Sequence, residues 1–134
     1  MVEFAISSLL FFTLIFGVIE MGWLLFTYHQ VTSAAREGTR YASVHGTTSQ
    51  GLRNPAEIAA YTIDPAAVKT AVLKKVTLSD PDALSVTVVR PDGDLQPRHR
   101  VRVEVSYPYR PLVGFILPVP TLTLRASSTM IVHY

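Results

Sequence analysis

The residues that could do acid–base or metal chemistry are scattered along this 134-residue chain. None of the four histidines stands in an HExxH motif or another metal-ligand spacing. Asp80 and Asp82, like Asp92 and Asp94, form close carboxylate pairs, but each pair brackets a turn, where Asp bonds to nearby backbone. The chain has no cysteine and no Gly-rich phosphate loop. We therefore expect no enzyme activity, no metal site and no cofactor.

A cluster of basic residues surrounds position 100. Strand alternation would place Arg98, Arg100 and Arg102 on one face of a sheet. Neither an aromatic platform nor a groove-reading motif accompanies them. We therefore expect a solvated strand face and no nucleic-acid binding.

A long apolar run divides the chain into two parts. Between Phe4 and Phe26 it carries one ionisable side chain, Glu20. At about 1.5 Å per helical residue, this run can cross a hydrocarbon core roughly 30 Å thick. It is too long for a signal-peptide core and no basic residue precedes it, so we expect it to be retained. Taken alone, the first basic residues after the run favour a cytoplasmic C-terminus.

The carboxylate of Glu20 is costly in such a run and normally needs a polar partner. One interpretation is contact with another chain's polar group or with a water-filled crevice. The other is a position near the membrane interface, close to Trp23 and Tyr28, from which Glu20 reaches water. Gly17 and Gly22 let helices approach closely, so the run is also suited to helix–helix packing.

The run continues into an amphipathic helix with a narrow face of small residues. Spacings of three and four predict that this face packs on the head of the protein. The opposite side carries charges, with Glu37 and Arg40 spaced as an ion pair. Gly46 is a plausible helix stop. The small-residue face consists of Val31, Ala34, Ala35, Gly38 and Ala42.

The rest of the chain predicts one short helix and three strands. Asp64 and Pro65 form a helix start, followed by apolar residues at helical spacing up to Val76. Residues 84–88, 101–107 and 121–133 alternate as strands, and a long hairpin loop joins the first two. These elements predict a three-stranded antiparallel sheet.

A proline-rich apolar segment lies between the last two strands. Its prolines at 108, 111, 118 and 120 predict that no strand runs through residues 107–120. Its apolar middle must pack on the first helix, a membrane surface or a neighbouring copy. The candidate subunit contacts in it are Leu112, Val113, Phe115 and Ile116.

The expected fold class is α+β, with a long N-terminal hydrophobic helix packed on a small antiparallel sheet and one short extra helix. We expect residues 1–46 to form the long helix, of which 1–27 are transmembrane or filament core and 28–46 amphipathic. Residues 47–134 would form an extracytoplasmic head.

Three segments of this chain together resemble a known family. Residues 1–5 (MVEFA), 17–22 (GVIEMG) and 34–42 (AAREGTRYA) look like the N-terminal signature of TadE-like proteins. These are pilin-like components of the tight-adherence branch of type IV pilus systems. Residues 103–109, the apolar proline loop and the Thr-rich last strand are similar too. Only residues 47–83 lie outside the resemblance.

The resemblance implies a precursor whose short basic leader is cut by a prepilin peptidase after a glycine. Glu3 matches the early glutamate that matters for assembly. That glutamate is usually fifth in the mature chain, which would place two residues upstream of Met1. A basic leader before Met1 would also resolve the orientation that the later basic residues favour.

The function implied is a structural pilin-like subunit of a tight-adherence pilus filament involved in cell adhesion. The chain would lie in the cytoplasmic membrane before assembly and in an extracellular filament afterwards. Expected partners are copies of itself or other pilins, the prepilin peptidase and the pilus assembly platform. The alternative is a membrane-anchored minor pilin or assembly scaffold that does not polymerise. The candidate assembly residues are Glu3, Phe4, Gly17, Glu20 and Gly22.

Overall fold

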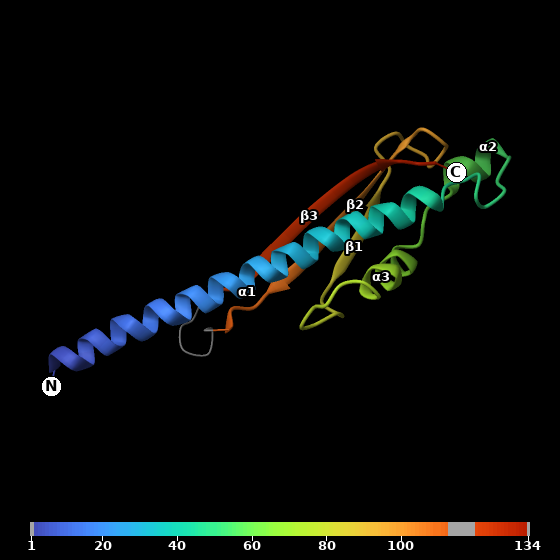
Figure 1. Cartoon of the computed structure of the whole chain (residues 1–134). Coiled ribbons are helices and arrows are strands. Elements are labelled where there is room, and N and C mark those ends of the chain that lie inside the picture. Colours follow the sequence, from blue (N-terminus) through green and yellow to red (C-terminus); the bar gives the residue numbers. More distant parts are fainter. Residues whose placement is uncertain (1, 113–119, 134) are drawn as a thin grey trace.

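One helix, α1 (Val2–Val44), runs the length of the molecule in the computed structural model, which describes residues 2–112 and 120–133. It is 43 residues long and contains no proline. Figure 1 shows that its C-terminal half lies along the sheet, whereas its N-terminal half extends beyond the rest of the molecule. The expected long apolar helix is therefore present as one uninterrupted rod.

The sheet has three antiparallel strands, β1 (Ser85–Val89), β2 (Arg100–Tyr109) and β3 (Leu122–Ile131), in the order β1-β2-β3. Val103 of β2 pairs with Val88 of β1 on one side and with Ser128 of β3 on the other. The predicted α+β class and three-stranded antiparallel sheet are confirmed.

The central strand β2 explains how the sheet attaches to the helix. Val101, Val103 and Val105 are buried, and the residues between them are exposed. Because alternate side chains point to opposite faces, the valines form one apolar face. α1 packs on β2 and β3, and α3 packs on α1 and β1, so two helices cover this face. The head therefore has a single core between sheet and helices.

Two short helices join α1 to the sheet, α2 (Pro55–Ala60) and α3 (Pro65–Leu73). The side chain of Asp64 accepts a 2.9 Å hydrogen bond from the backbone amide of Ala66, so α3 starts as predicted. α2 was not predicted, because the sequence indicated one short helix. It has six residues, none of them buried, and no side-chain cap, so it leaves little periodic signal.

Two predictions near the ends of β2 are wrong. β2 runs to Tyr109 through Pro108, although proline was expected to exclude a strand there. Pairing with β1 ends at Ser106, so among the described strands Pro108 has only β3 as a neighbour, and such an edge tolerates a missing donor. Arg98 lies before the strand, in a turn with φ 74°, and does not share the face of Arg100 and Arg102.

Candidate functional site

The N-terminal half of α1 is an apolar surface that the rest of the described chain leaves uncovered. Its most hydrophobic 18-residue window has a mean hydropathy of 2.2, and none of it is buried. Phe4, for example, is 79% exposed. An exposed apolar surface of this length needs lipid or protein to cover it. Its large exposed residues include Val2, Phe4, Leu9, Leu10, Phe11, Phe12, Leu14, Val18, Ile19 and Met21.

Four of the five predicted assembly residues are exposed on this free half of α1, namely Glu3, Phe4, Gly17 and Gly22. Glu3 is exposed and is the acidic residue of the first helical turn, where the helix dipole favours a negative charge. A Cβ added to Gly17 or Gly22 would meet no atom within 4 Å. The two glycines are therefore open positions on the helix surface, where another helix could approach closely.

Glu20 has polar partners within its own chain. The Tyr109 hydroxyl donates to Oε1 of Glu20 at 2.5 Å, and the backbone amide of Leu112 donates to Oε2 at 2.9 Å. Burial and the bond to Glu20 raise the pKa of Tyr109 well above its usual value, so the phenol keeps its proton and stays the donor. The sequence interpretations sought partners outside the chain and missed this contact, because residues 89 positions apart give no local signal.

A small notch of about 120 Å³ lies where α1 leaves the head. Trp23 and Thr27 of α1 line it together with Tyr107, Tyr109 and Arg110 from the end of β2 and the segment that follows. The rings of Trp23 and Phe26 stack beside it, with centroids 5.5 Å apart. Aromatic and polar side chains therefore meet at the boundary between the free and the packed half of α1.

The small-residue face of α1 lies against the sheet and α3. Ala34, Ala35 and Ala42 are fully or almost fully buried. A Cβ on Gly38 would stand 3.0 Å from Val103 Cγ1 and 3.2 Å from Val68 Cγ1. Small side chains here let the helix axis approach both elements, as the stripe pattern predicts.

Sequence reasoning missed Thr39, which is fully buried on the same face. Its hydroxyl lies 2.7 Å from the carbonyl oxygen of Ala35 and 3.2 Å from that of Ser128 in β3. A hydroxyl in a tight helix–sheet contact must find an acceptor, and here two are within reach. Its position four residues after Ala35 was the available signal.

Most of α1 matches a known protein family. Residues 1–40 match the model for TadE-like proteins. The resemblance deduced from the glutamate-containing run and the AAREG segment is thereby confirmed over these residues. The match makes this segment similar to TadE-like proteins, and the apolar helix that contains it is suited to membrane anchoring. No curated protein and no solved structure matches the chain.

Beyond the TadE-like segment, the predicted subunit contacts are only partly visible. Leu112 is 48% exposed next to the Glu20 contact. Val113, Phe115 and Ile116 lie outside the described residues.

The predicted Glu37–Arg40 pair is not formed, because Glu37 Oε1 lies 2.7 Å from Nζ of Lys75, just after α3.

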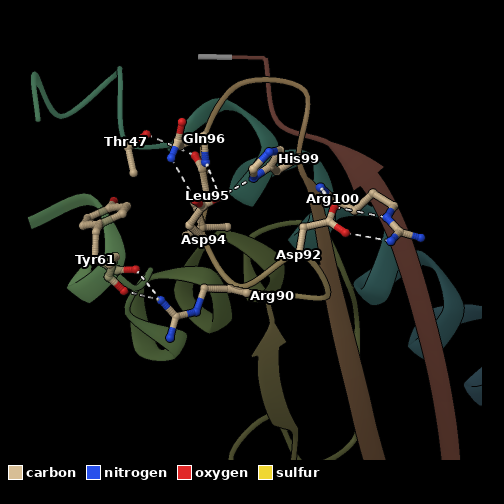
Figure 2. A network of polar contacts seen from close by, with 10 residues as sticks. Thr47, Tyr61, Arg90, Asp92, Asp94, Leu95, Gln96, His99 and Arg100 are labelled. Carbon is tan, nitrogen blue, oxygen red and sulfur yellow. Dashed lines mark hydrogen bonds and ion pairs between the residues drawn. The ribbon is translucent and has the colours of Figure 1, made fainter. Parts of the chain in front are cut away.

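The loop between β1 and β2 carries a polar network at the far end of the head (Figure 2). Arg90 donates to the carbonyl oxygen of Tyr61 at 2.8 Å, and the Thr47 amide donates to that of Leu95 at 3.2 Å. These bonds join the loop to the stretch of chain between α1 and α3. Leu95 is fully buried, so the loop has its own apolar anchor, which was not predicted from the sequence.

Asp92 and Asp94, the two aspartates of this loop, hydrogen-bond to nearby residues, as expected of aspartate at a turn. Arg100 binds Asp92 through Nη2 at 2.7 Å, and its side-chain and backbone hydrogen bonds lower the Asp92 pKa to about 2. Burial alone would raise the pKa of Asp94, but hydrogen bonds from His99 and Gln96 hold it below its usual range. Among residues 2–112 and 120–133, no three metal-binding side chains converge.

Proposed function

We propose that this chain is a structural pilin-like subunit that assembles into a tight-adherence pilus filament through the N-terminal half of α1. One observation carries the proposal: a single rigid helix is packed on the head along one half and bare along its apolar other half. In the membrane, lipid covers the bare half. In a filament, equivalent halves of other subunits replace lipid, which conserves apolar burial.

The charge at the start of α1 supports the same arrangement. Glu3 is exposed in the first turn, so its carboxylate is available to a positive group on a neighbouring subunit. A free N-terminal ammonium would be such a group. We assign Glu3 and Phe4 to the entry end of the contact, and Gly17 and Gly22 to positions of close helix approach.

No enzymatic role, metal or organic cofactor enters this proposal, because filament assembly requires only packing and charge pairing. The adhesive activity would belong to the finished fibre. Its partners would be like subunits or other pilins, with the prepilin peptidase and the assembly platform acting before polymerisation. The head would then form the outer surface of the fibre.

Cysteine cross-linking tests the proposal, and because the chain has no native cysteine, every cross-link must form at the introduced thiol. Gly17→Cys and Gly22→Cys place a thiol at open positions on the bare half of α1. A filament subunit gives a ladder of many cross-linked copies in sheared surface material. A ladder that stops at one partner, held in the membrane, would favour the minor-pilin or scaffold alternative. Glu57→Cys, on exposed α2 of the head, is the matched control.

A further inference from the structure

We propose that the Glu20–Tyr109 contact sets the level at which the head meets the lipid surface before assembly. The surface in question, here called the neck, comprises Trp23, Phe26, Tyr109, Arg110 and Leu112. The proposed occupant is the headgroup layer of a bilayer containing anionic lipid. This inference rests on membrane insertion of α1 and does not require filament formation.

The head contacts α1 closer to the N-terminus of the helix than the small-residue stripe indicates. Below Val31, the head-facing side of the helix continues through Thr27, Leu24 and Glu20 at spacings of four, three and four. Thr27 is buried, and Leu24 packs against the core. Glu20, the next residue of this line, is held by Tyr109 and Leu112. The head therefore overlaps the C-terminal end of the apolar run.

This overlap shortens the segment that can lie in hydrocarbon. With the head hydrogen-bonded at Glu20, the part of α1 that precedes this hydrogen bond runs from Val2 to Ile19. Eighteen residues at 1.5 Å each are about 27 Å long, close to the thickness of a hydrocarbon core of roughly 30 Å. The lipid boundary thus falls at Glu20, earlier than the predicted limit at residue 27.

The neck has the chemistry of a membrane interface. Trp23 and Phe26 stack on each other at this level, and amphipathic aromatics collect where hydrocarbon meets headgroups. Arg110 is exposed and forms no ion pair with any residue in 2–112 or 120–133. A cation next to the aromatics complements the phosphate of an anionic lipid. Lipid headgroups therefore fit this surface better than an apolar partner does.

The bonds to Glu20 allow its carboxylate to lie at this boundary. A carboxylate near hydrocarbon is costly unless donors satisfy it, and the Tyr109 hydroxyl and the Leu112 amide are two such donors. Glu20 is then a positioning residue that acts within one chain. Without it, the head loses the attachment that lies nearest the N-terminus of α1 among the described residues, and α1 is free to sink further into the bilayer.

Trp23 is the single tryptophan of the chain, so its fluorescence reports the depth of the neck directly. We would reconstitute the full chain in vesicles of phosphatidylcholine and phosphatidylglycerol that carry bromine at shallow or deep acyl positions. Shallow bromines should quench Trp23 roughly twofold more than deep ones, as expected of an interfacial indole. Stronger quenching by deep bromines would overturn the proposal. Absence of quenching by either lipid would also overturn it, because a second copy would then cover the neck.

Variants separate the contact from general packing. Glu20→Leu and Tyr109→Phe should both shift the quenching toward the deep bromines, and the double variant should shift it no further than Glu20→Leu. Tyr28→Phe is the control, since Tyr28 is exposed on α1 without a hydrogen bond from its hydroxyl in the described structure. Arg110→Glu should change the depth of Trp23, measured by this quenching, only in vesicles that contain phosphatidylglycerol. Unchanged depth in Glu20→Leu and Tyr109→Phe would contradict the proposal, whatever the cross-linking of filaments shows.

Discussion

Gly38 of α1 and Val103 of β2 lie so close that a Cβ on the glycine would stand 3.0 Å from Val103 Cγ1. Val103 is also one of the β2 residues that pair with both neighbouring strands. The helix is therefore seated on the centre of the sheet at this point. A larger residue at position 38 would press on the buried side chains of Val103 and Val68, so either these side chains or the helix would have to shift.

Replacement of Gly38 by Leu should destabilise the head by about 1–3 kcal/mol, the usual cost of overpacking a tight core. Urea unfolding in detergent micelles, followed by circular dichroism, would measure this change. Gly22→Ala is the matched control on the same helix, because its added methyl group meets open space. Equal stability of Gly38→Leu and the parent chain would show that the helix is not held against Val103.

Thr39→Val should cost about 1 kcal/mol, because the half-buried Ser128 carbonyl loses a hydroxyl within hydrogen-bonding reach while side-chain volume is kept. The same unfolding assay applies. Thr13→Val removes a similar hydroxyl bond, 2.8 Å to the carbonyl oxygen of Leu9, but on the exposed half of α1. It should leave head stability unchanged. Equal effects of the two substitutions would argue against a special role for Thr39 between helix and sheet.

Acid should weaken the β1–β2 loop through Asp92. Its pKa is about 2 when folded, against 3.8 for an ordinary aspartate, so its stabilising contribution is full above about pH 4. As the pH falls from about 4 to 2, the folded carboxylate takes up its proton and the contribution is lost. The free energy of unfolding of Asp92→Asn should therefore fall less steeply over this range. Asp82→Asn, whose carboxylate bonds to no described residue, should retain the parent slope.

Glu3→Gln should permit membrane insertion but reduce incorporation into filaments. A subunit contact weakened by about 1.4 kcal/mol lowers incorporation roughly tenfold. Quantitative immunoblots of membrane and sheared fractions from cells expressing both parent and variant chains would measure the ratio. Glu57→Gln, an acid on exposed α2, is the control that should incorporate normally. Normal incorporation of Glu3→Gln would remove Glu3 from the contact.

The sequence predicted the features that depend on local periodicity. The small-residue stripe, the alternation of Val101, Val103 and Val105, and the cap at Asp64 each repeat within a few residues. These patterns led to the long helix, the three strands and the start of α3. The family resemblance followed from residues in the same long helix.

Contacts between distant segments could not be predicted in this way. Tyr109 meets Glu20 and Ser128 meets Thr39 only because α1 lies on the sheet, and no spacing in the chain records either pairing. The predicted pairing of Glu37 with Arg40 was wrong for the same reason, since the fold places Lys75 next to Glu37. Pro108 was misjudged because its place at a singly paired edge appears only once the strand lengths are known.

The most direct test of assembly into filaments is electron microscopy of material sheared from cells, with N-terminal sequencing and mass analysis of its subunits. We expect fibres built from this chain, with the bare half of α1 in the fibre core and the sheet outside. Sequencing would also identify the first residue of the assembled subunit and its distance from Glu3. The contradicting result would be fibres that lack this chain while the whole population stays in the membrane fraction.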